Sequence, residues 1–210
     1  MNPGDSLPLK QLDGAPPISF KCIAARQQFI APPADAKPNP DCGHVRRKLD
    51  DASDNANSIV GVLSFGEFRM FAAGDLTWNM ETKLVCPINL VGKIDVYQVT
   101  HHGLDQSNNP VVVKSLTPTV AIFGNGPKKG AEPATWETIK SSDSIQGIYL
   151  IHKSDSPRGP NIPDEFIANI NSGAEDQGNF ISLSTDPAGK SYTVAIPANK
   201  HERTFQTTAK

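Results

Sequence analysis

Two apolar runs in the chain end abruptly in side chains that can bind a metal ion. The run over residues 69–73 is followed by Asp75, and the run over residues 94–100 is followed by the adjacent pair His101 and His102. Carboxylate and imidazole ligands suit zinc, manganese or iron, and a carboxylate can also bridge two ions. These three side chains are therefore the first candidates for chemistry.

The strand and helix between Asp75 and the histidine pair predict that these three side chains lie close together at one edge of a sheet. His101 and His102 follow Asp75 by 26 and 27 residues, which is one strand–helix–strand unit. Parallel strands joined in this way end at the same sheet edge, about 5 Å apart, or about 10 Å with one strand between them. Two adjacent histidines at a strand end cannot both point into the core, so one must face the edge or solvent. The alternative for Asp75 is that it caps the following helix.

Four nearby polar residues have both a functional and a plain structural interpretation. Asp105 and Ser107 either brace the histidine pair by hydrogen bonds or form an ordinary Asx or Ser turn. Lys128 and Lys129 either attract a phosphate or carboxylate to the site or are solvated loop lysines.

The rest of the chain indicates an α/β domain of short segments, punctuated by 18 prolines and 16 glycines. An irregular segment over residues 31–57, rich in Pro, Asp and Asn, predicts a long surface loop. Two alternating segments around Pro187 predict a β-hairpin, and the residues after Pro197 predict a frayed polar tail. Strands are expected at residues 18–25, 58–64, 67–73, 94–100, 119–123, 147–151, 179–184 and 191–196, and helices at residues 77–85, 110–116, 133–140 and 163–170.

Length and composition indicate one domain with a real core. The 210 residues carry 20 Lys and Arg against 22 Asp and Glu, and the net charge of −2 argues against nucleic acid as a partner. No window approaches 18 apolar residues, so no membrane span is expected. The first ten residues lack the features of a signal peptide. We therefore expect a soluble cytoplasmic chain, or an exported one if the native N-terminus lies upstream.

The three cysteines are too few and too scattered for a disulfide framework, and they contain no Cys-x-x-Cys pair. No structural zinc site is therefore expected from them. We expect Cys22, Cys42 and Cys86 to pack as free thiols, with a single Cys42–Cys86 or Cys22–Cys42 bridge as the alternative.

The two candidate segments also resemble a known family in their order. Gly-Asp-Leu at residues 74–76 after a strand, then a helix, a strand and Thr-His-His-Gly-Leu-Asp-Gln-Ser at residues 100–107, resembles the second half of the metallo-β-lactamase fold. The nearest likeness is to bacterial hydrolases related to the metallo-β-lactamase-like domain of competence DNA-uptake proteins. Asn125 belongs to a matching segment and joins the two lysines as a candidate substrate contact. The likeness extends to residues 3–7, 57–58, 65–68, 125–130, 149–152 and 166–169.

The resemblance implies an α/β domain of the αββα type over residues 1–200, mainly its C-terminal half, with an added C-terminal hairpin and a polar tail at residues 201–210. Asp75 would bridge two metal ions, zinc or else manganese or iron, and one histidine would bind the second ion. We favour His102 as that ligand and place His101 beside it or near the leaving group. The two ions would activate a water that attacks a phosphoester, an ester or lactone, or a β-lactam.

The sequence departs from the family at its main ligand cluster. The His-x-His-x-Asp-His motif of the first half is absent, and His44, His152 and His201 are expected to be structural or surface residues. A zinc site needs about four ligands, so we expect weak metal binding and poor turnover from this chain alone. A lone half of a two-sheet sandwich also exposes an apolar face, which predicts a homodimer, a complementing first-half chain or a rearrangement.

The leading functional hypothesis is a metal-dependent hydrolase that acts on a small-molecule ester or phosphoester, with two ions per complete site. The alternative is a catalytically inactive fragment or partner-binding module that retains half of the fold. A reading frame that continues upstream of Met1 into the missing motif would favour the enzyme.

Overall fold

The computed structural model describes residues 1–160 and 162–208, which form a mixed α/β structure with two sheets. The large sheet has the strand order β2-β1-β3-β4-β5-β6-β7-β8, and the small sheet has the order β11-β10-β9. The strands are β1 (Ile18–Ala25), β2 (Gln28–Phe29), β3 (Val60–Phe65), β4 (Phe68–Ala72), β5 (Val96–Val99), β6 (Val120–Phe123), β7 (Gly147–His152), β8 (Ile167–Asn169), β9 (Ser182–Thr185), β10 (Ser191–Ile196) and β11 (His201–Gln206). The helices are α1 (Trp78–Val85), α2 (Pro110–Leu116) and α3 (Pro133–Lys140), with 3-10 turns η1 (Pro40–His44), η2 (Asp54–Asn57), η3 (Thr100–Gly103), η4 (Asp164–Phe166), η5 (Gly173–Glu175) and η6 (Pro197–Asn199).

The centre of the large sheet is parallel, and this sets the position of the candidate site. β4, β5, β6, β7 and β8 pair in parallel in that order, whereas β1, β3 and β4 are antiparallel neighbours. Strands that are covered on both faces need nearly continuous apolar side chains, and Val96, Tyr97, Val120 and Ala121 are accordingly all buried. The carboxyl ends of β4 and β5 therefore lie side by side at one edge, as predicted.

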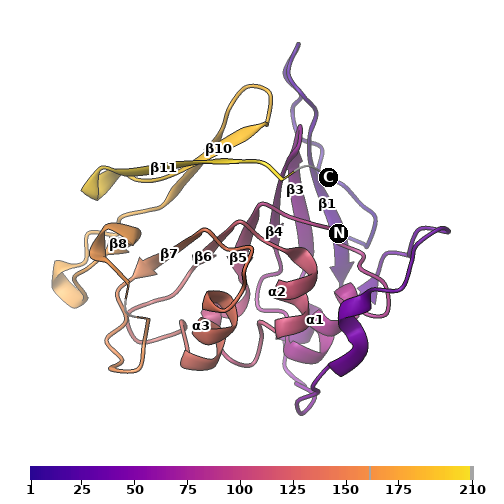
Figure 1. Cartoon of the computed structure of the whole chain (residues 1–210), viewed down its shortest axis with the longest axis horizontal. Helices are drawn as coiled ribbons and strands as arrows, with labels where there is room; N and C mark the ends of the chain where they lie inside the picture. Colours follow the sequence, from indigo (N-terminus) through magenta and orange to yellow (C-terminus); the bar gives the residue numbers. More distant parts are fainter. Residues whose placement is uncertain (161, 209–210) are drawn as a thin grey trace.

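The helices α1, α2 and α3 cover one face of this sheet (Figure 1). Leu84 of α1, Val112 of α2 and Ile139 of α3 share one buried cluster with side chains of the strands. α2 and α3 begin at Pro110 and Pro133, where the missing N–H of proline costs no hydrogen bond, and both span the predicted residues. None of the helices in the described part of the chain is long and apolar enough to cross a membrane.

The small C-terminal sheet covers the opposite face, as Figure 1 shows for β10 and β11. The ring of Phe205 in β11 stacks on Tyr192 in β10 with centroids 5.5 Å apart, and Tyr192 packs on Phe68 of β4 at 5.1 Å. The expectation of an exposed apolar face is therefore wrong for this surface, because the chain's own C-terminal strands bury it. The expected polar tail is also wrong over residues 201–206, which form β11; residues 209–210 of that tail lie outside the described residues.

Two further expectations are wrong. Residues 163–170 were expected to be helical but form the turn η4 followed by β8, in which Ile167 pairs with Leu150 of β7 and is buried. The β-branched side chain fits this strand position better than a helix. The expectation of free thiols is wrong for Cys42 and Cys86, and the alternative of a single Cys42–Cys86 bridge is confirmed; Cys22 is a buried free thiol, as expected.

The long loop over residues 31–57 is anchored on α1. Its Cys42 is bonded to Cys86 at the end of the helix, 44 residues further along the chain. The indole N–H of Trp78 donates a 2.7 Å hydrogen bond to the carbonyl of Arg46. A disulfide that closes a loop of this length stabilises a fold by about 2–4 kcal/mol. The loop is thus a fixed part of the structure, and its turn η2 reaches the candidate site.

We predict that Phe205→Ala lowers the free energy of unfolding by about 3–5 kcal/mol, because it removes a buried aromatic ring from between the two sheets. Phe205 is 4% exposed, whereas Phe180 in the same region of the sequence is 61% exposed. Phe180→Ala is therefore the matched control, with an expected change below about 0.5 kcal/mol. Urea unfolding measures both values, and equal losses in the two variants would contradict the proposed role of the C-terminal sheet.

A buried carboxyl group joins α1 to the start of α2. Glu81 is fully buried, and its Oε2 accepts a 2.8 Å hydrogen bond from the backbone N–H of Asn109, the N-cap of α2. Burial raises the pKa of Glu81 from 4.5 to about 7, although the hydrogen bonds of the carboxylate act in the opposite direction. The folded protein therefore holds this proton more tightly than the unfolded chain does.

The raised pKa of Glu81 predicts that stability falls as the pH rises. The contribution is complete below pH 4.5 and is lost as the pH rises through about 7, which amounts to on the order of 3 kcal/mol. Glu81→Gln should remove this fall in stability between about pH 5 and pH 8 in urea unfolding series, and should be more stable than the wild-type protein at the upper end. The lowered pKa of His101 contributes a rise in stability with pH that should remain in the variant. The exposed Glu67→Gln is the control, which should keep the fall. A fall that survives Glu81→Gln would assign it to another group.

Candidate functional site

The candidate site lies at the carboxyl ends of β4 and β5, which are adjacent and parallel. Asp75 follows β4 in a tight turn, and the backbone N–H of His101 donates a 2.9 Å hydrogen bond to the carbonyl of Gly74 in that turn. His101 and His102 both have left-handed backbone conformations, with φ of 55° and 58°. Residues other than glycine adopt this conformation only where their surroundings hold them, often at functional sites. The N-cap of α1 is Thr77, so Asp75 does not cap the helix.

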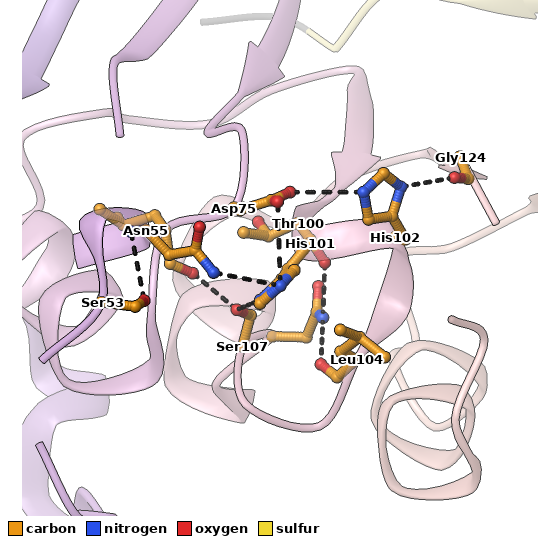
Figure 2. Close-up of polar contacts among 11 residues, drawn as sticks. Ser53, Asn55, Asp75, Thr100, His101, His102, Leu104, Ser107 and Gly124 are labelled. Atoms are coloured by element: carbon orange, nitrogen blue, oxygen red, sulfur yellow. Dashed lines mark hydrogen bonds and ion pairs between the residues drawn. The ribbon is translucent and has the colours of Figure 1, made fainter. Parts of the chain in front are cut away.

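Each carboxylate oxygen of Asp75 faces one imidazole (Figure 2). His101 Nε2 lies 3.8 Å from Oδ2, and His102 Nε2 lies 3.6 Å from Oδ1. Both distances exceed those of ordinary hydrogen bonds. The predicted meeting of the three residues is thus confirmed, and Asp75 lies between two separate imidazole partners.

The proton of His102 is fixed on its other nitrogen. His102 Nδ1 lies 2.8 Å from the carbonyl oxygen of Gly124 at the end of β6. A carbonyl oxygen can only accept a hydrogen bond, so Nδ1 must carry the hydrogen. In the neutral ring, Nε2 then presents a lone pair to Asp75.

His101 also carries its proton on Nδ1, because of a hydrogen bond with Ser107. The hydroxyl of Ser107 donates its only hydrogen to the carbonyl of Leu76 at 2.6 Å. Ser107 Oγ lies 3.2 Å from His101 Nδ1 and must therefore accept a hydrogen bond from it. Ser107 braces His101 as predicted, and Nε2 of His101 also presents a lone pair to Asp75.

The two histidines differ in their exposure. The His101 side chain is 5% exposed and that of His102 is 39% exposed, which agrees with the prediction that only one of them can be buried. Burial lowers the pKa of His101, although the negative charge of Asp75 acts in the opposite direction. Burial thus favours the neutral ring of His101, which is the form that binds metals.

Asn55 is a residue of this site that sequence reasoning missed. It belongs to η2 in the loop over residues 31–57, and its side-chain Nδ2 lies 3.5 Å from Nε2 of His101 (Figure 2). An amide N–H can donate to the lone pair of this ring nitrogen. The only signal in the sequence was the length of the loop, which indicates a functional or mobile segment without identifying a residue.

Other predicted residues lie around the site in different roles. The side chain of Asp105 is exposed, and its backbone N–H donates to Glu132, so it does not brace the histidines. Asn125 is buried and donates a 2.7 Å hydrogen bond to the carbonyl of His152, which joins the ends of β6 and β7. Lys128 and Lys129 line a cavity beside the site. Asp105 therefore does not brace the histidines in the described part of the chain, and a substrate contact by Asn125 stays a prediction.

Two of the remaining histidines, His152 and His201, have partners other than Asp75. His201 Nε2 lies 3.2 Å from the hydroxyl of Tyr149 in the packing between the two sheets, and His152 Nδ1 lies 3.7 Å from Asp176. Both are structural histidines, as predicted. The side chain of His44 lies outside the described part of the structure.

The donor set fits part of a metal centre. Two ligands bound to one tetrahedral zinc ion are roughly 3.3–3.6 Å apart, close to the 3.6 Å and 3.8 Å between Asp75 and its two imidazoles. The ring centroids of His101 and His102 are 6.3 Å apart, and in the described residues no group of three or more His, Cys, Asp or Glu side chains is placed to hold one ion. The geometry therefore offers two pairs of donors that share one carboxylate.

No protein-family model and no curated protein matches this chain. The structure shows a mixed α/β fold with a large mixed sheet and a small antiparallel sheet. The resemblance to metallo-β-lactamase-fold hydrolases stays a prediction.

We predict that both histidines carry their proton on Nδ1, which ¹⁵N NMR of the imidazole rings measures directly at mildly alkaline pH. Ser107→Ala removes the acceptor of His101, so His101 should become a mixture of the two tautomers. His102 is the internal control, because its acceptor is the carbonyl of Gly124. A wild-type His101 that carries its proton on Nε2 would contradict the assigned hydrogen-bond direction.

Proposed function

We propose that this chain carries half of a dinuclear metal site of a hydrolase that acts on esters or phosphoesters. The observation that supports the proposal is that two imidazole lone pairs and two carboxylate oxygens, all of them acceptors, face one another at 3.6 Å and 3.8 Å. The Asn55 amide lies 3.5 Å from one of these lone pairs, on His101 Nε2, and a cation would relieve the repulsion that remains between the acceptors. Zinc, manganese or iron would satisfy both pairs.

The residues of the chain have distinct tasks in this proposal. Asp75, His101 and His102 would hold the metal through their carboxylate oxygens and Nε2 atoms. A bound metal would supply a water of lowered pKa and Lewis-acid polarisation of the substrate's carbonyl or phosphoryl oxygen. Ser107 and the Gly124 carbonyl orient the imidazoles and fix their tautomers, as is usual around metal-bound histidines.

Two donors for each ion are fewer than the four that a zinc site needs. The chain alone should therefore bind metal weakly, and the complete site requires further ligands from a complementing chain or from a second copy. This shortage of ligands also supports a second candidate function, in which the chain is a partner-binding module without catalysis. The two functions differ in whether Asp75 and the histidines bind metal at all.

The disulfide bears on where the function operates. Bonds such as Cys42–Cys86 persist mainly in oxidising compartments. We propose that the protein is exported.

The experiment that tests the proposal is a zinc titration followed by calorimetry and by the ¹⁵N signals of the two imidazoles. We expect binding with a dissociation constant of about 10 µM or weaker, because each ion has only two protein donors. Asp75→Asn should weaken binding by about tenfold or more. Asp35→Asn, an exposed residue of the long loop, is the control and should bind as the wild-type protein does.

Three results would decide between the functions. Zinc that binds Asp75→Asn as well as the wild-type protein, or that leaves both imidazole signals unchanged, would overturn the proposed metal site and leave the partner-binding module. Sub-micromolar binding of two zinc ions would show that the chain alone supplies enough ligands, against our expectation of two protein donors per ion. Hydrolysis of bis(p-nitrophenyl) phosphate or p-nitrophenyl acetate that stops on addition of a chelator, and in Asp75→Asn, would support the enzyme.

A further inference from the structure

A cavity of about 520 Å³ opens beside the candidate site. Its walls come from three segments that follow neighbouring parallel strands: residues 104–105 after β5, residues 128–134 after β6 and residues 154–158 after β7. Ligands of open α/β sheets bind in the crevice outside the carboxyl ends of the strands. The cavity therefore occupies the part of the fold where a substrate is expected.

The cavity and the histidine pair share a wall. The backbone N–H of Ala131 donates a 2.9 Å hydrogen bond to the carbonyl of His102, and that of Glu132 donates to Gly103 at 2.9 Å. Gly130 approaches so closely that a Cβ atom there would lie 2.1 Å from the carbonyl oxygen of His102. The loop that forms the cavity is thus fixed to the segment that carries the metal donors.

Three cations line the cavity. Lys128, Lys129 and Arg158 come from two different loops, and none of them makes an ion pair with a carboxylate in the described part of the chain. Two acids, Asp105 and Glu132, also line the cavity, so its lining carries three positive and two negative charges. This surplus of 3 − 2 = +1 contrasts with the net charge of −2 of the whole chain. Such a local field attracts anionic ligands.

The remaining lining adds hydroxyl donors and an apolar wall. Ser154 Oγ accepts from the backbone N–H of Ser156 at 3.2 Å, and Ser156 Oγ accepts from that of Arg158 at 3.3 Å. Each hydroxyl hydrogen is therefore available to a ligand oxygen. Leu104, Pro133 and Ala134 supply apolar surface nearby. A volume of this size suits a small organic molecule and exceeds what an inorganic anion fills.

We propose that this cavity binds an organic phosphate ester, with the phosphate at Lys128, Lys129 and Arg158 and the organic group against Leu104. Three cations match the double negative charge of a phosphate monoester better than the single charge of a carboxylate. Binding itself needs only these residues. The conclusion that a phosphate ester is the substrate of the adjacent metal site rests on the proposed function.

The test is a titration of the full chain with phenyl phosphate in the presence of a chelator, monitored by ¹⁵N–¹H NMR. We expect shifts at the backbone of residues 128–134 and 154–158 and weaker binding with rising salt. Lys128→Ala/Lys129→Ala should weaken binding by about tenfold or more, as expected for the loss of two charge-assisted contacts. Lys93→Ala/Lys140→Ala removes the same charge from exposed positions outside the cavity and should leave the affinity unchanged.

Three further probes separate the parts of the ligand. Inorganic phosphate and phenol should each bind more weakly than phenyl phosphate, and benzoate should bind more weakly because it carries a single charge. Equal affinity for benzoate and phenyl phosphate would overturn the phosphate class. If both double-lysine variants lose the same affinity for phenyl phosphate, the cavity is not the binding site. The same conclusion follows if the NMR shifts are confined to other segments. Arg158→Ala gives a second variant from a separate loop, and its binding should also weaken.

The same titration distinguishes this inference from the proposed metal site. Asp75→Asn leaves every cation of the cavity in place, so it should bind phenyl phosphate as the wild-type protein does when chelator is present. If Asp75→Asn retains this binding and zinc binds nowhere near the histidines, phosphate-ester binding in the cavity is supported and its link to hydrolysis is overturned. If zinc binds as proposed but phenyl phosphate does not bind, the metal site is supported and phosphate-ester binding in the cavity is overturned.

Discussion

The candidate site depends on two backbone carbonyl oxygens, those of Leu76 and Gly124. One takes the hydroxyl hydrogen of Ser107, and the other takes the Nδ1 hydrogen of His102. Because carbonyl oxygens only accept, these contacts determine which nitrogen of each imidazole lacks a hydrogen. The arrangement exists only because β4, β5 and β6 are parallel neighbours whose ends meet at one edge. Sheet topology therefore decides the chemical state of the histidines.

The C-terminal strands explain how the chain has a closed core on both faces of its large sheet. α1, α2 and α3 bury one face, and β10 and β11 bury the other through Tyr192 and Phe205. Of the homodimer, complementing chain and rearrangement that the exposed face predicts, the small sheet makes none necessary for the burial of this face.

Much of the site could be predicted from the sequence because its residues follow strongly apolar segments. Asp75, His101 and His102 come directly after buried strands, and sheet geometry then brings them together. The contact of Asn55 could not be predicted, because it belongs to an irregular loop held in place by contacts distant in sequence. β11 was missed for a similar reason, since its polar side chains face solvent and only Phe205 is buried.

The unequal exposure of the two histidines has a kinetic consequence. The His102 side chain is 39% exposed, so protons can exchange at its ring without a change in the fold. The His101 side chain is 5% exposed and contacts Asn55 and Ser107, so exchange there should need local opening, such as movement of the η2 segment. The two sides of Asp75 should therefore equilibrate on separate time scales, with the His102 side first and the His101 side limited by local opening of a loop that a disulfide restrains.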